Sequence, residues 1–119
     1  MKVHIQKNHI NLSPNQESYI NDKISQLDKY IVSPNSETEA WVNIGKPSQH
    51  HQHGGVLHLT VDIHVPGKSF RAEATGDDVF SITNEVQDEL QREIRKFKEK
   101  IRTGQRKGFR LFKIFRNED

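Results

Sequence analysis

The side chains with the most readable chemistry are a run of lysines and arginines toward the C-terminus. Residues 92–116 carry eleven Lys or Arg and two Glu, whereas residues 1–76 carry seven basic and seven acidic side chains. A segregated cationic block of this kind neutralises phosphates, so it points to a polyanionic partner: RNA, DNA or an anionic membrane surface. Its first part consists of Arg92, Arg95, Lys96, Lys98, Lys100 and Arg102.

The last segment, from Thr103 to Asp119, mixes cations with apolar and aromatic side chains. The cations are Arg106, Lys107, Arg110, Lys113 and Arg116, and the apolar residues are Phe109, Leu111, Phe112, Ile114 and Phe115. This mixture suits RNA, because cations neutralise phosphates while rings stack on unpaired bases. The alternatives are a membrane anchor, a strand that pairs with another chain, and a segment folded back on its own domain. We expect a tail that is disordered alone and orders on its target.

Histidines form the second group with possible chemistry. His50, His51 and His53 lie in a stretch, residues 45–55, that is rich in Gly, Gln and His. Imidazole is a common transition-metal ligand, but a metal site usually needs ligands held by structure and supported by further contacts. The stretch has no Cys and no carboxylate, so we predict a solvated hairpin loop and no metal site. The sequence also lacks a Gly-rich phosphate loop and the HExxH and GxSxG motifs, so we expect neither enzymatic activity nor a cofactor.

Size and composition restrict the class of protein. The chain has 119 residues, 32% of them hydrophobic, which suits one domain with a modest core. It has no cysteine, which excludes disulfides, thiolate metal sites and a Cys nucleophile. No apolar run approaches the roughly 20 residues of a membrane span, and the N-terminus does not resemble a signal peptide. We therefore expect a soluble, cytoplasmic protein without a membrane partner.

A long amphipathic helix, predicted over residues 77–102, must position the first basic residues. Its apolar side chains recur at steps of three or four and so share one face. They are Val79, Ile82, Val86, Leu90, Ile94, Phe97 and Ile101. Asp77 is the predicted N-cap. Gly104 is predicted to stop the helix and to lie just past its last residue. In this geometry residues 92, 95 and 102 lie opposite the apolar face, and residues 96, 98 and 100 flank it.

Four stretches alternate apolar and polar residues as strands with one buried face do: residues 2–9, 38–44, 57–65 and 70–75. After the first, Ser13-Pro14-Asn15-Gln16 has the form of a helix capping box, and the helix is predicted to reach Tyr30 or Ile31. The order predicts an α+β fold, a β-α-β-β-β-α sandwich with two helices on one face of a four-stranded sheet, like a double-stranded-RNA-binding domain. Strands one and two should be parallel and the others antiparallel.

The alternation places Trp41 and three histidines on the outward face of this sheet. An exposed Trp can stack on a base or anchor a protein partner, although singly exposed aromatic residues are also common. Both interpretations of Trp41 stay open at this point. His4, His58 and His64 are expected to be ordinary polar residues on a wet face.

Three stretches resemble the ribosome hibernation promoting factor family, also called ribosome-associated inhibitor A or light-repressed protein. They are INLSPNQESYINDKISQLDKYI at 10–31, RAEATGDDVFSITNEV at 71–86 and DELQREIRKFKEKI at 88–101. The last two in tandem are fairly specific, and the resemblance covers positions 1 to about 102. It implies the fold already predicted and a role in idle ribosomes. Members of the family bind small-subunit RNA in the channel of mRNA and tRNA, which blocks initiation and protects inactive ribosomes.

The resemblance also implies which residues contact RNA. By position they are Lys23, Lys29, Arg92, Arg95, Lys96, Lys98 and Lys100, to which the basic run adds Arg102, Arg106, Lys107 and Arg110. Gln26 and Glu89 stand where family members usually have Lys, which thins the basic patch between the helices. Lys7 stands where a small residue, often Gly, is common.

We therefore expect a ribosome-binding domain over residues 1–102 and a basic-aromatic tail over 103–119. The long form of the family has a further C-terminal domain that pairs ribosomes, and the seventeen residues after Arg102 cannot hold it. The resemblance thus implies a short form, a translation inhibitor that is monomeric off the ribosome, with small-subunit RNA as its partner and no DNA. The alternative is a free-standing RNA- or protein-binding module of the same fold that is not specific to ribosomes.

Overall fold

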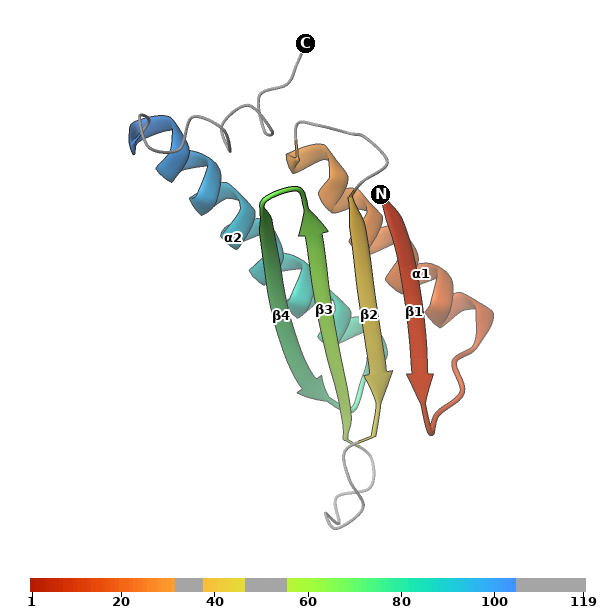
Figure 1. Ribbon diagram of the computed structural model, residues 1–119. Helices are drawn as coiled ribbons and strands as arrows, with labels where there is room; N and C mark the ends of the chain where they lie inside the picture. Colours follow the sequence, from red (N-terminus) through yellow and green to blue (C-terminus); the bar gives the residue numbers. More distant parts are fainter. Residues whose placement is uncertain (32–37, 47–55, 105–119) are drawn as a thin grey trace.

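A four-stranded sheet with two helices on one face forms the protein (Figure 1). The computed structural model describes residues 1–31, 38–46 and 56–104. The elements follow the order β1 (Lys2–Asn8), α1 (Pro14–Ser25), η1 (a 3₁₀ helix, Gln26–Tyr30), β2 (Glu39–Gly45), β3 (Leu57–Val65), β4 (Lys68–Gly76) and α2 (Val79–Gly104). The strands lie in the order β1-β2-β3-β4, with β1 parallel to β2 and the other pairs antiparallel. The predicted α+β fold class, its element order and its strand directions are confirmed.

Alternation along the strands divides the sheet into an apolar and a polar face. Ile5, Val42, Val61 and Ala72 are opposite one another in successive strands, so they form one row across all four. Val42 and Val61 are 1% and 0% exposed, because their row faces the helices. The row beside it, His4, Trp41, Asp62 and Arg71, points away from the helices because neighbouring residues of a strand project to opposite faces.

Helix α1 begins as its sequence predicts. The Ser13 hydroxyl accepts a hydrogen bond from the Gln16 backbone N–H at 3.1 Å, and the Gln16 side chain accepts one from the Ser13 N–H at 2.9 Å. Pro14 occupies the first turn, where its missing N–H costs no helical hydrogen bond. The helical segment reaches Tyr30 as predicted, but its last five residues wind as a 3₁₀ helix, a common form of helix C-terminus.

Helix α2 has 26 residues, about seven turns, and starts two residues later than predicted. The predicted N-cap, Asp77, is wrong. Asp78 takes this position, because its carboxylate accepts from the Ser81 N–H at 3.0 Å and its carbonyl accepts from the Ile82 N–H at 3.1 Å. Gly104 was predicted to follow the helix, but it lies within it as the last described residue.

The core lies between the sheet and the two helices. Helix α1 contributes Ile20 and Ile24, and α2 contributes Leu90 and Ile94, all 0% exposed. The rest of the predicted apolar face of α2 is buried from Val79 to Val86 and half-buried at Phe97, while the Ile101 side chain lies outside the described part. Both helices run in the same direction behind the sheet, so their C-terminal ends lie toward the same end of it (Figure 1).

Two predicted features lie outside the described residues: the histidines of the loop, 50–53, and the tail from residue 105 onward. Over the part of the chain that is described, none of the helices is both long and apolar enough to span a bilayer.

Candidate nucleic-acid interface

The helices α1, η1 and α2 form one layer, and the side of this layer that points away from the sheet is the candidate interface. Hydrogen bonds between α1 and α2 fix the position of one helix relative to the other. The Tyr19 hydroxyl donates to Asn84 Oδ1 at 2.7 Å. The Gln87 side-chain amide donates to the Lys23 backbone carbonyl at 3.0 Å and to Gln26 Oε1 at 3.2 Å. Successive turns of one helix therefore contact successive turns of the other. The helices form a parallel pair in which side chains more than sixty positions apart share one surface.

Three of the predicted RNA-binding residues converge on Tyr30, the last residue of η1. The Lys29 ammonium lies 5.5 Å from the centroid of the Tyr30 ring, and the Arg95 guanidinium carbon lies 5.3 Å from it. Lys98 Nζ donates a hydrogen bond to the Tyr30 backbone carbonyl at 3.0 Å. This contact joins the two helical segments, so Lys98 has a structural role that the sequence did not reveal.

Arg92 lies on the same outer side of α2 with a different kind of support. Its guanidinium donates to Glu89 Oε1 at 2.7 Å, a pair three residues apart along the helix. The Arg92 side chain stays 66% exposed. Together with Asp88, Gln91 and Arg95 it lines a shallow recess of about 290 Å³. The recess thus brings two arginines and one aspartate together at the surface.

At the other end of the helix pair, the predicted residue Lys23 lies beside two aromatic side chains. Its ammonium is 5.6 Å from the Tyr19 ring centroid, and the Tyr19 ring meets the Phe80 ring edge-on at 4.8 Å. Phe80 is 37% exposed. The sequence did not reveal this pair, because Phe80 interrupts the polar side of α2 without belonging to its apolar repeat.

Lys96 and Lys100 separate from this surface and lie on the side of α2 that faces β4. They line an open groove of about 440 Å³ between the two elements, together with Glu93, Glu99, Lys68, Phe70 and Phe97. The Lys68 ammonium is 5.4 Å from the Phe70 ring centroid and 5.0 Å from that of Phe97. Lys68, the first residue of β4, is thus a further cation beside α2 that the sequence did not reveal.

Four of the predicted residues cannot be placed. The side chain of Arg102, and all of Arg106, Lys107 and Arg110, lie outside the described part of the structure. Their proposed contact with RNA stays a prediction.

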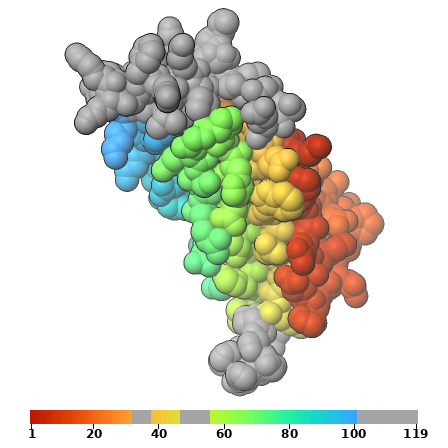
Figure 2. Space-filling model, viewed as in Figure 1, coloured from red at the N-terminus to blue at the C-terminus, as the bar shows by residue number. Residues whose placement is uncertain are grey.

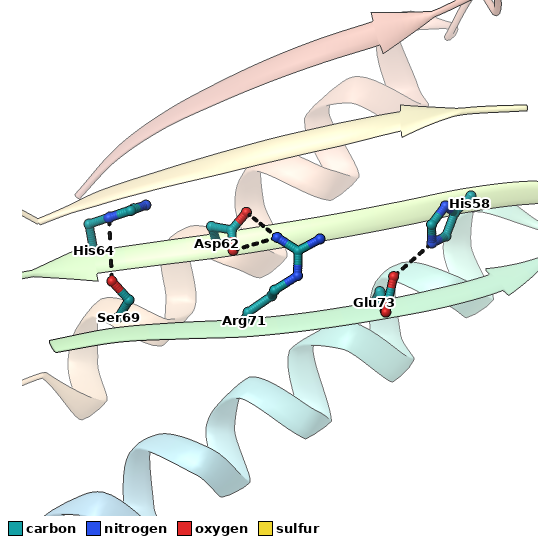
Figure 3. Close-up of polar contacts among 6 residues, drawn as sticks. All are labelled: His58, Asp62, His64, Ser69, Arg71 and Glu73. Carbon is teal, nitrogen blue, oxygen red and sulfur yellow. Dashed lines mark hydrogen bonds and ion pairs between the residues drawn. The ribbon is translucent and has the colours of Figure 1, made fainter. Parts of the chain in front are cut away.

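The open face of the sheet has a different character, with charges paired across strands (Figure 3). Arg71 donates to both carboxylate oxygens of Asp62 at 3.0 Å, and His58 lies 2.9 Å from Glu73. His64 lies 3.5 Å from the Ser69 hydroxyl. Figure 2 shows this face, on which the four strands lie side by side. Acidic and basic groups are thus interspersed here, which contrasts with residues 92–102 of α2, where six cations stand against two glutamates.

Trp41 lies in the middle of this face and is 44% exposed. The His4 ring stacks on it with centroids 4.0 Å apart and an angle of 15° between the rings. His4 Nε2 is also 3.8 Å from Glu39 Oε1 and is buried without a hydrogen bond, so His4 differs from the ordinary polar residue expected at this position. Within the described ranges, no three His, Asp or Glu side chains are grouped so as to hold a metal ion.

Comparison with known proteins gives the family. Residues 3–102 match the family model described as Sigma 54 modulation protein / S30EA ribosomal protein. The chain belongs to this family. The chain is 28% identical to a ribosome hibernation promotion factor from Lactococcus lactis over 120 aligned positions, which are 99% of this chain and 60% of that protein. It is 26% identical to a ribosome hibernation promoting factor from Acinetobacter guillouiae, over 81% of this chain and 86% of that one. The family predicted from the sequence is confirmed.

Two solved structures have the same fold. The N-terminal domain of Protein Y from Thermus thermophilus has a TM-score of 0.65 at 18% identity, over 82% of this chain and 99% of that one. A ribosomal subunit interface protein from Coxiella burnetii has a TM-score of 0.65 at 15% identity, over 83% and 99%. At these identities the likeness concerns the fold. The chain spans 60% of the length of the Lactococcus relative, so the rest of that protein lies outside the alignment.

Proposed function

We propose that this protein is a ribosome hibernation factor that docks its helix pair on the RNA of the small ribosomal subunit. In this proposal it occupies the channel that mRNA and tRNA use, and it inhibits translation while stabilising idle ribosomes. The names of the relatives support a ribosomal role, and membership of the S30EA family supports it further. The observation that carries the choice of surface is the contrast between the C-terminal half of α2, where residues 92–102 carry six Lys or Arg and two Glu, and the open sheet, where opposite charges are paired.

Phosphate neutralisation would supply most of the affinity. Lys29, Arg92 and Arg95 present cationic groups on a layer whose helices are fixed to each other by hydrogen bonds. Each phosphate neutralised releases a condensed counterion, so the logarithm of affinity should fall with the logarithm of salt concentration by roughly 0.7 to 0.9 per contact. A rigid arrangement of charges also selects for shape, because only a folded RNA holds its phosphates at matching positions.

Inhibition in this account needs no chemistry on a substrate. A folded domain that occupies the channel excludes mRNA and tRNA by its volume, so the proposed role is non-enzymatic and uses no cofactor. The protein would act as a monomer before it binds, and it would be found where ribosomes are, in the cytoplasm. The basic-aromatic tail, residues 103–119, would extend the contact with RNA.

Competition with the natural occupants of the channel tests this proposal. Isolated small subunits are saturated with this protein, an mRNA and initiator tRNA are added, and the protein that still sediments is measured. We expect this protein to be displaced in proportion to the mRNA and tRNA that bind. When this protein is in excess, we expect it to displace the mRNA and tRNA. Simultaneous binding without competition would contradict a site in the channel. Equal affinity for a generic RNA duplex and for small subunits would instead support the non-specific binding module.

A further inference from the structure

Tyr30 is the point at which the two helical segments bring their cations together. Lys29 comes from η1 and Arg95 from α2, and both charged groups lie within 5.5 Å of the Tyr30 ring centroid. Tyr30 is half-buried and packs against the core, whereas Lys29 and Arg95 are exposed. The ring is therefore fixed from below and carries two cations at the surface.

We propose that Tyr30 is a positioning residue of the RNA-binding surface: its ring holds Lys29 and Arg95 in place for phosphate contacts that neither cation would make as well if its side chain moved freely. This inference rests on the proposed function. It assigns to an uncharged side chain a role in affinity that charge counting does not suggest.

The physical basis is the attraction between a cation and the negative face of an aromatic ring. Such a contact confines Lys or Arg without using a hydrogen-bond acceptor, so the N–H donors stay available for phosphate oxygens. A side chain that is already confined also loses less rotamer freedom when it binds. Tyr30 thus reduces the entropic cost of binding for two cations at once.

Arg92 is confined in a different way, by a carboxylate and not by an aromatic ring. Its guanidinium is confined by the Glu89 carboxylate at 2.7 Å, which brings a negative charge toward any phosphate that approaches. The Tyr30 ring brings no net charge. Arg95 is therefore better prepared for a phosphate than Arg92, although Arg92 has the shorter contact in the free protein.

The backbone tie at this position makes the inference testable. Lys98 donates to the Tyr30 carbonyl, which is part of the main chain and remains whatever side chain follows it. A substitution of the ring therefore leaves the bond between η1 and α2 available. Its effect on the two cations can be separated from the docking of the helices.

The test measures affinity for isolated small subunits over a range of salt concentrations. The variants are Tyr30→Phe, Tyr30→Leu, the pair Lys29→Gln/Arg95→Gln, and Tyr30→Leu combined with that pair. We expect Tyr30→Phe to bind as the wild type does, because a benzene ring attracts cations as well. Tyr30→Leu should bind about 5- to 30-fold more weakly, the range that two exposed cation–ring contacts give. In the Lys29→Gln/Arg95→Gln background, Tyr30→Leu should have no further effect.

A loss of the same size in both backgrounds would overturn the proposal, because Tyr30 would then act without the two cations. Wild-type affinity of Tyr30→Leu would overturn it as well. If Tyr30→Leu fails to fold, pentafluorophenylalanine at position 30 keeps the shape of the ring and reverses the charge of its face. It should bind more weakly than Tyr30→Phe, and equal affinity would overturn the proposal. A wild-type protein that ignores small subunits would overturn the proposed function and, with it, this role of Tyr30.

Discussion

The side-chain amide of Gln87 in α2 donates a hydrogen bond to the backbone carbonyl of Lys23 in α1 at 3.0 Å. Lys23 lies in the last turn of α1, where backbone carbonyls run out of partners within the helix. Gln87 therefore caps one helix from the other and fixes how far the two helices are shifted along each other. The positions of all cations on the outer side of the helix layer depend on this shift.

Removal of this cap should destabilise the protein without unfolding it. We expect Gln87→Ala to lower the free energy of unfolding by about 1 kcal/mol, the usual net contribution of one hydrogen bond. Chemical denaturation followed by circular dichroism measures the change. Glu85→Ala is the matched control, at an exposed position of the same helix. Equal stability of Gln87→Ala and Glu85→Ala would show that the hydrogen bond does not hold the helices.

The start of α2 gives a prediction that depends on pH. Hydrogen bonds from the Ser81 hydroxyl and then from the Ser81 backbone N–H hold the pKa of the Asp78 carboxyl below its ordinary value of 3.8. Because the folded state prefers the ionised carboxylate, Asp78 stabilises the fold above pH 3.8, and this contribution is lost as the pH falls through the lower, folded pKa. Asp78→Ala should therefore lower the melting temperature at neutral pH, and the difference from wild type should shrink in acid.

Asp77→Ala is the control for this prediction, since Asp77 is the residue that the sequence favoured as the cap. The substitution should change the melting temperature less than Asp78→Ala at neutral pH. The opposite order, or a difference for Asp78→Ala that stays constant down to the lowest pH at which the protein is folded, would contradict Asp78 as the N-cap.

Most of the fold could be predicted because its signals are local. Ser13 and Gln16 identify the start of α1 within four residues, and the alternation through Val61 fixes which face of β3 is buried. The N-cap of α2 was missed by one residue because two aspartates stand side by side. The first of them, Asp77, was predicted, but it is the Asp78 carboxylate that reaches Ser81.

Much less of the candidate site could be predicted. The sequence identified Lys29, Arg95 and Lys98 as basic residues, but their meeting at Tyr30 depends on how the two helices pack. Residues 30 and 95 are far apart in the chain, and no local pattern links them. The separation of Lys96 from Arg95, onto the side of α2 that faces β4, likewise became visible only in three dimensions.

The close approach of β1 to β2 gives a prediction about stability. Gly45 pairs with Asn8 at the end of the two strands, and a Cβ atom at position 45 would lie 2.5 Å from the Asn8 carbonyl oxygen. Backbone atoms in a parallel pair have little room to move, so Gly45→Ala should cost about 1 to 3 kcal/mol of unfolding free energy, as overpacking does. Denaturant titration measures this cost.

Gly76→Ala is the matched control for Gly45→Ala. A Cβ at position 76 would lie 2.9 Å from Ile82 Cγ2, a side-chain atom that can shift. The Gly76 variant should therefore lose less stability than the Gly45 variant. A Gly45→Ala protein as stable as the wild type would mean that β1 and β2 are not packed as closely as the structure shows.

The central claim, that cations of the helix layer dock on small-subunit RNA, is tested most directly by two variants with the same change in net charge. One is Arg92→Glu/Arg95→Glu on α2, and the other is Lys2→Glu/Lys46→Glu, at one exposed residue of β1 and one directly after β2, called here the sheet variant. Circular dichroism first establishes that both are folded, and affinity for isolated small subunits is then measured against salt concentration. We predict that the α2 variant loses affinity and that its log–log salt slope falls by roughly 1.4 to 1.8, as for two lost phosphate contacts, whereas the sheet variant keeps the wild-type slope. Equal losses in both variants, or none in the α2 variant, would contradict the claim.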